Sequence, residues 1–162
     1  MNNEISKLTE IIDKIIEREK NISMTSANYR LLKSTSKNRD KATHKVEEGI
    51  RSYNNDDLNS AYQLFSEAIN IEADADAYFN RGVVCMDYRQ LFNAITDFTA
   101  AILLFPIYAN AYHNRALSIL QILSENSALD NYKLVSFAKK DLTKSLELGN
   151  TESLQYLQGL EG

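Results

Sequence analysis

Residues 77–82 read Ala-Tyr-Phe-Asn-Arg-Gly and residues 111–116 read Ala-Tyr-His-Asn-Arg-Ala, so one six-residue block returns after 34 residues. The positions around this block also repeat. Gly49, Ala61, Phe65 and Ala68 return 33 residues later as Gly82, Ala94, Phe98 and Ala101, and the last three return 44 residues later as Ala138, Leu142 and Ser145. Self-similarity at such a period is typical of stacked repeat architectures. We therefore expect an array of about three similar units.

Spacing within each unit predicts a helical hairpin. Ala94, Phe98 and Ala101 are four and three residues apart, which places them on one face of a helix. Gly82 lies twelve residues earlier, on a preceding helix. Antiparallel helices approach closely only where small side chains meet, so we expect Gly82 and the two alanines at the seam, with Phe98 beside it. Pro106 ends the second helix, because the residue before a proline avoids the α conformation.

Composition supports an all-α fold. The 162 residues include one proline and five glycines, the residues that turns need and helix interiors exclude. No apolar run approaches the roughly 20 residues of a membrane-spanning helix. Acidic residues interrupt the apolar positions near the N-terminus, which argues against a signal peptide. Cys85 is the single cysteine and fits a reducing cytosol, so we expect a cytoplasmic protein without membrane association.

The charge distribution divides the chain near Lys41. Residues 1–41 carry nine Lys/Arg and six Asp/Glu, whereas residues 42–162 carry nine and sixteen. We therefore predict two parts, an N-terminal segment over 1–41 and a repeat domain over 42–162. The segment combines an amphipathic helix with a basic linker. This linker contains no interleaved aromatic residues in its second half and belongs to an otherwise acidic chain, so a solvated linker is favoured over nucleic-acid binding.

The N-terminal helix has one apolar stripe. Ile5, Leu8, Ile12 and Ile15 recur at three- and four-residue steps over about four turns, the pattern of an amphipathic helix. This stripe either packs back on the repeats or pairs with a partner, including a second copy of the chain through residues 4–20. Both alternatives stay open at the level of sequence.

The repeat is similar to the tetratricopeptide repeat (TPR). Six residues of the stretch 75–106 stand where this family has its characteristic residues: Tyr78, Gly82, Ala94, Phe98, Ala101 and Pro106. The resemblance implies a right-handed superhelix of about three hairpins, over about 42–74, 75–108 and 109–150. Leucines at 154, 157 and 160 share one side and predict a short capping helix over 151–160 that closes the stack. The third unit has about ten extra residues, and we expect both of its helices to be longer by about five.

Nothing in the sequence indicates catalysis. His44 and His113 lie in different repeats without metal-ligand spacing to another histidine or a cysteine, and no glycine-rich phosphate loop is present. Cys85 stands where the repeat buries an apolar side chain. We therefore predict no enzyme activity, no catalytic residue, no metal site and no cofactor.

The resemblance implies that the first helix of each hairpin lines a concave groove that binds a peptide or helix. The predicted groove residues are Ile50, Tyr53, Asp76, Phe79, Asn80, Val83, Met86, Asn110, His113, Asn114, Leu117 and Leu120. Their apolar members would take anchor side chains, or alternatively only pack between neighbouring helices. Asn80 and Asn114 can both donate to and accept from a peptide backbone.

One known role of the family is not expected. Members that bind the acidic C-terminal tails of cytosolic chaperones use lysines, an arginine and asparagines on this surface. The matching positions here are Val46, Ile50, Asn80, Asn110 and Asn114, and only Asn80 agrees. Arg81 and Arg115 lie one position away and are expected to bridge adjacent repeats. The sequence thus predicts a cytosolic adaptor. The alternative is a self-associating structural or secretion-chaperone-like protein that dimerises through its N-terminal helix.

Overall fold

The structure is a computed structural model that describes residues 3–20 and 37–160. These residues form eight α-helices and no strand, which confirms the all-α prediction. The helices are α1 (Asn3–Glu19), α3 (Lys37–Asn54), α4 (Leu58–Ile71), α5 (Ala75–Asp87), α6 (Leu91–Leu104), α7 (Ala109–Glu125), α8 (Tyr132–Glu147) and α9 (Ser153–Gly159). None of these helices is long and apolar enough to cross a membrane.

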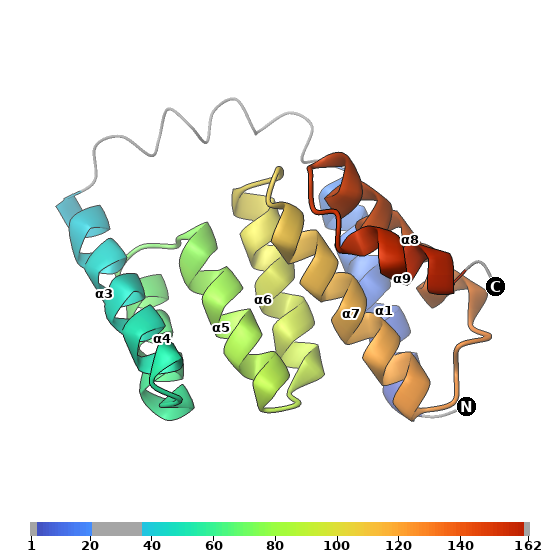
Figure 1. Cartoon of the computed structure of the whole chain (residues 1–162), viewed down its shortest axis with the longest axis horizontal. Coiled ribbons are helices and arrows are strands. Elements are labelled where there is room, and N and C mark those ends of the chain that lie inside the picture. Colours follow the sequence, from blue (N-terminus) through green and yellow to red (C-terminus); the bar gives the residue numbers. More distant parts are fainter. Residues whose placement is uncertain (1–2, 21–36, 161–162) are drawn as a thin grey trace.

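Helices α3 to α8 form three antiparallel hairpins that stack side by side (Figure 1). In the first two hairpins the two helices approach as closely as the small residues predict. A Cβ added at Gly49 would lie 2.6 Å from the Phe65 ring, and one added at Gly82 would lie 2.7 Å from the Phe98 ring. Both rings are fully buried. The paired glycine and phenylalanine therefore set the distance between the two helices of a hairpin.

The third hairpin is longer than the second, but its two helices are not lengthened equally. Helices α7 and α8 have 17 and 16 residues, against 13 and 14 in α5 and α6. The remaining extra residues lie in the turn between Glu125 and Tyr132. The prediction that both helices are longer by about five residues therefore agrees with α7 but is wrong for α8. Asn131 sets the start of α8, because its side chain accepts a hydrogen bond from the Leu134 amide at 3.2 Å.

The first repeat also begins earlier than expected. Helix α3 starts at Lys37, so Arg39 and Lys41 lie in a helix and not in the predicted linker. No proline or glycine separates them from the rest of α3, and nothing in their side chains stops a helix from extending over them. The remainder of the predicted linker, up to residue 36, lies outside the described residues.

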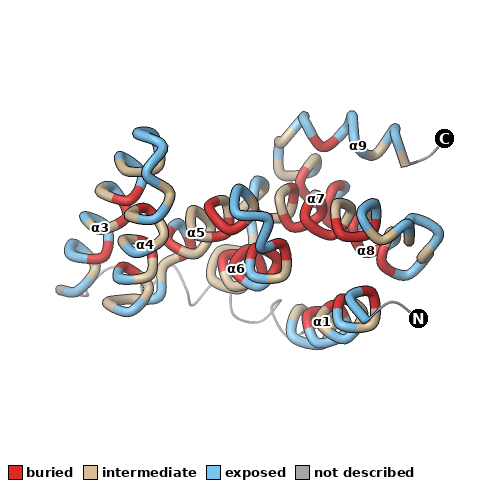
Figure 2. Tube along the Cα trace, turned by 90° about the horizontal axis from the view of Figure 1, so that it is seen from below, coloured by how far each residue is buried: buried red, intermediate tan, exposed pale blue. Residues whose placement is uncertain are grey.

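Helix α1 packs on the chain's own repeats. It contacts α6, α7 and α8, and its stripe of Ile5, Leu8, Ile12 and Ile15 is buried in the largest core cluster of the described residues. Figure 2 places α1 and α9 on opposite faces of the third hairpin. The stripe that was a candidate for pairing with a second copy is therefore covered within the chain, and the first of the two open alternatives holds in this structure.

An ion pair secures each of the last two hairpins, fully buried at Arg115 and partly buried at Arg81. Arg115 makes a two-pronged contact with Asp141 at 2.7 and 2.8 Å, and its third nitrogen donates to Thr99 of the preceding hairpin at 3.1 Å. Arg81 pairs in the same way with Asp97, at 2.7 and 2.8 Å. Its third nitrogen donates to a serine of the first hairpin at 3.3 Å. The expected bridging of adjacent repeats by these arginines is confirmed.

Glu19 extends the network at Arg115 to α1. A Glu19 oxygen lies 2.6 Å from the guanidinium. Burial alone lowers the pKa of Arg115, but the attraction of Asp141 and then of Glu19 outweighs it, so the pKa is raised. The guanidinium stays charged and ties the end of α1 to the third hairpin.

Candidate functional site

The predicted groove residues lie on the face of the stack formed by α3, α5 and α7, called here the groove face. Ile50, Asp76 and Asn110 are exposed, and most of the others are half-buried. Phe79, Val83 and Met86 also pack against the small core cluster around Phe98. These three side chains therefore both support the hairpins and show part of their surface on the groove face.

Two aspartates on this face are held by tyrosines of neighbouring elements. The Tyr53 hydroxyl donates to Asp87 at 2.8 Å, and the Tyr108 hydroxyl donates to Asp76 at 2.9 Å. Burial, followed by the contact with Asp87, raises the pKa of Tyr53 to about 12. Burial and Asp76 likewise raise the pKa of Tyr108. Both tyrosines thus stay protonated as donors, and the aspartates give the groove face a negative charge.

The three asparagines of the groove face differ in the hydrogen bonds that their side chains make. The Asn80 amide nitrogen donates to the Asp76 carbonyl one helical turn earlier, at 2.8 Å. The Asn110 side chain accepts from Asn150 at 3.0 Å. Among the described residues, the Asn114 side-chain amide has no hydrogen-bond partner, although it is half-buried. Asn114 is therefore the amide most available to an incoming polar group.

One residue expected in the groove, His113, is covered instead. His113 is 5% exposed; its Nδ1 lies 2.8 Å from the Ser153 hydroxyl of α9, and Tyr156 packs edge-on against its ring. Leu120 is half-buried and packs against the large core cluster. The His113 ring is therefore unavailable to a ligand, because α9 lies over this part of α7. The sequence predicted a capping helix here, but it did not predict which side chains this helix would cover.

A pocket of about 340 Å³ opens beside α9 on the groove face. Its lining comes from Phe79 of α5, from Asn110, His113 and Asn114 of α7, and from the turn 149–152. Gly149 has a φ of +100°, which turns the chain sharply after α8. Sequence reasoning missed the contribution of this turn, since turn residues distant in sequence from α7 carry no periodic signal.

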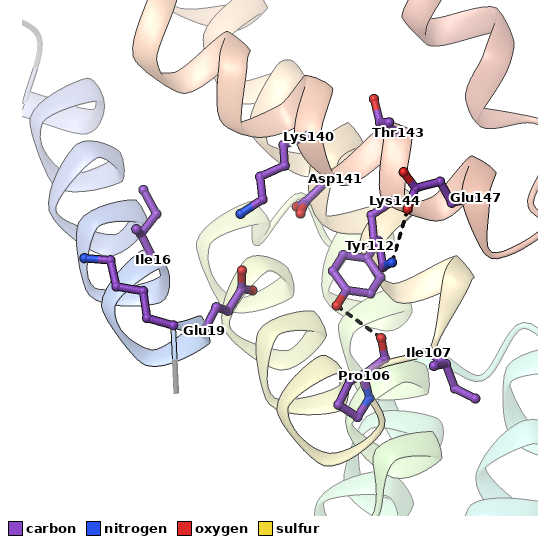
Figure 3. A pocket seen from close by; sticks show the side chains of 11 residues that line it. Ile16, Glu19, Pro106, Ile107, Tyr112, Lys140, Asp141, Thr143, Lys144 and Glu147 are labelled. Atoms are coloured by element: carbon purple, nitrogen blue, oxygen red, sulfur yellow. Dashed lines mark hydrogen bonds and ion pairs between the residues drawn. The ribbon is translucent and has the colours of Figure 1, made fainter. Parts of the chain in front are cut away.

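A larger hollow of about 830 Å³ lies on the opposite face, between the end of α1, the α6–α7 turn and α8 (Figure 3). Most of its charged groups are already paired. Glu19 and Asp141 contact Arg115, and Lys144 pairs with Glu147 at 3.1 Å. The Tyr112 hydroxyl donates to the Pro106 carbonyl at 3.2 Å. These internal pairings make the hollow a weaker candidate than the groove face.

No group of three or more His, Cys, Asp or Glu side chains within residues 3–20 and 37–160 is arranged to hold a metal ion. Cys85 is fully buried, and burial raises the pKa of its thiol to about 11. A thiol of this kind is a packing residue and a poor nucleophile.

Comparison with solved structures identifies the architecture. The first TPR domain of Spaghetti (RPAP3), bound to the HSP90 peptide SRMEEVD, matches with a TM-score of 0.66 and 21% identity, over 76% of this chain and 92% of that chain. The TPR2B domain of yeast Sti1, in its pHsp70 complex, matches with a TM-score of 0.58 and 26% identity, over 74% and 92%. The chain folds as a tetratricopeptide-repeat protein. Its α3–α4, α5–α6 and α7–α8 hairpins are the TPR units.

Sequence comparison adds relatives that are much longer than this chain. Mouse DnaJ homolog subfamily C member 7 is 34% identical over 101 residues, which cover 59% of this chain and 20% of that protein. The human counterpart is 33% identical over the same length. The chain thus spans about a fifth of the length of these curated relatives. No model of a known protein family matches the chain.

Proposed function

We propose that this TPR protein is a cytosolic adaptor that binds a peptide or a helix along its groove face, and that it carries out no catalysis itself. The TPR domains that it resembles are solved with HSP90 and pHsp70 ligands, which supports a role in binding protein segments. Half-buried apolar side chains such as Val83 offer anchor sites, and the free Asn114 amide offers a contact to a peptide backbone.

The charge of the groove face determines which ligands it favours. None of the predicted groove residues is a lysine or an arginine, while Asp76 and Asp87 add negative charge. A peptide such as SRMEEVD, with its three acidic side chains, would meet like charges and no cation among these groove residues. The proposed ligand is therefore neutral or basic, unlike the acidic tail in the RPAP3 complex.

The test uses a phage-displayed library of random 12-residue peptides, selected on the full chain. Recovered peptides are then measured by fluorescence anisotropy against an Asn80→Ala/Leu117→Ala variant of unchanged helicity. We expect at least tenfold weaker binding to this variant, because both substitutions remove groove contacts. Gln63→Ala serves as the control, since Gln63 is an exposed residue of α4, outside the groove face. It should leave the affinity unchanged.

Equal binding to the groove variant and to the Gln63→Ala control would show that the groove face is not the binding surface. Recovery of mainly acidic peptides would keep the groove but contradict the ligand charge proposed for it.

A further inference from the structure

The pocket beside α9 is small and has walls from three parts of the chain. Phe79 forms one wall, Asn110 and Asn114 form another, and the turn 149–152 closes it. At about 340 Å³, it lies at the lower end of the range for small-ligand pockets. It therefore fits one long side chain and not a folded element.

The turn that closes the pocket is held in place from both sides. The Asn150 side-chain nitrogen donates to the Asn110 side-chain oxygen at 3.0 Å, and the Asn150 side-chain oxygen Oδ1 accepts from the Glu152 backbone amide at 3.0 Å. These contacts hold the backbone of Glu152, which is one of the residues that line the pocket. Among the described residues, the Glu152 carboxylate has no cationic partner.

No positive charge in the lining opposes this carboxylate at neutral pH. The lining contains no lysine or arginine. Its only basic group is His113, and desolvation, partly offset by Glu152, lowers the pKa of this ring. His113 is therefore neutral at pH 7. The remaining polar groups are uncharged amides and a hydroxyl, whose oxygens accept hydrogen bonds.

We propose that this pocket is a specificity site that accepts a lysine or arginine side chain of the peptide bound on the groove face. The cationic head would pair with Glu152 and donate to the Asn114 oxygen, while the aliphatic stem would lie against Phe79. A long basic side chain has this division into an apolar stem and a charged head. The inference rests on the proposed groove function and adds the side chain that the groove selects.

The same 12-residue peptide library tests this assignment on the full chain. We expect the recovered peptides to share a Lys or Arg at a fixed distance from their apolar residues. In one such peptide, replacing that residue by norleucine should weaken binding to the wild type about tenfold. With Glu152→Gln the same replacement should cost less than about twofold, because the partner charge is gone.

Glu10→Gln is the matched control. Glu10 is exposed on α1, on the other side of the hairpins, and its substitution removes the same charge. It should leave the tenfold effect of the norleucine peptide intact.

Groove-dependent peptides without a fixed Lys or Arg would overturn the pocket assignment and leave the adaptor function standing. An equal norleucine effect in wild type and Glu152→Gln would overturn it as well. Recovery of no groove-dependent peptide would overturn both the function and the pocket.

Discussion

Single residues set the helix spacing within each hairpin. In the first two hairpins a glycine faces a phenylalanine ring, and no room remains for a Cβ at Gly49 or Gly82. The third hairpin has Ala116 and Leu142 at the corresponding positions, both fully buried in one core cluster. A larger residue on one helix is thus matched by a smaller one on the other, which keeps the packed volume similar.

Gly82→Ala is expected to lower the free energy of unfolding by about 1–2 kcal/mol, since overpacking against Phe98 outweighs the better helix propensity of alanine. Adding Phe98→Leu should recover part of this loss, because the pair then matches the third hairpin. Urea denaturation measures both effects. Gly159→Ala, where an added Cβ meets nothing within 4 Å, is the control and should not destabilise. A double variant less stable than the single one would contradict the packing argument.

His113 gives the docking of α9 a pH dependence. Desolvation lowers its pKa below the ordinary value of 6.5, so the folded state prefers the neutral ring. The unfolded chain therefore binds the proton more readily. The stabilisation is complete above about pH 6.5 and decreases as the pH falls toward the lower pKa of the folded state.

We expect the stability advantage of the wild type over His113→Asn to shrink between pH 7.5 and pH 5.5. Urea denaturation of both proteins at the two pH values checks this. All other titratable groups are common to both proteins, so the comparison isolates His113. An advantage that stays constant or grows at pH 5.5 would show that His113 is not held neutral.

At the scale of elements, α1 is part of the core. Its apolar stripe is buried against α6, α7 and α8, and Glu19 supplies a partner to the buried Arg115. Lys133 of α8 also pairs with Asp13 at 2.5 Å. Removing α1 would expose the apolar face of the third hairpin and take one carboxylate from a fully buried guanidinium.

Ile12→Ala should lower the free energy of unfolding by about 2–4 kcal/mol, as expected for a fully buried isoleucine. Lys14→Ala, at an exposed position of the same helix, should change it by less than about 0.5 kcal/mol. The measurement is repeated at two protein concentrations tenfold apart. Packing within one chain gives the same stability at both, whereas pairing with a second copy would make it rise with concentration.

At the scale of the whole molecule, the stack is uneven. The largest core cluster joins residues of α1 and α6 to α8, whereas the first hairpin belongs to a smaller cluster that it shares with α5. Figure 1 shows α3 and α4 at one end of the stack, with a neighbouring hairpin on one side only. In stacked repeats, stability depends on such neighbour interfaces.

Hydrogen exchange should therefore show the first hairpin opening at a free energy about 1–3 kcal/mol below that of the third. The amides of Phe65 and Leu142 allow a direct comparison, because both side chains are at most 1% exposed and occupy equivalent positions. Equal protection of the two would mean that the stack opens as one unit.

The sequence alone determined the repeat, the hairpins and the seam. Each depends on spacing along a helix, and the fixed geometry of the helix converts spacing directly into faces. Gly82, Phe98 and Pro106 could be placed in this way. The amphipathic face of the N-terminal helix was equally readable from Ile5 to Ile15.

Only the tertiary structure decided what covers each face. The stripe on α1 could meet any apolar surface, and it meets α6 to α8, far along the chain from its own position. His113 has the spacing of a groove residue but is buried because α9 folds back over it. Glu19 carries no sequence signal for Arg115. Such contacts join residues 40 to about 100 positions apart, and the choice among competing apolar surfaces depends on the packing of the whole stack, which no local spacing encodes.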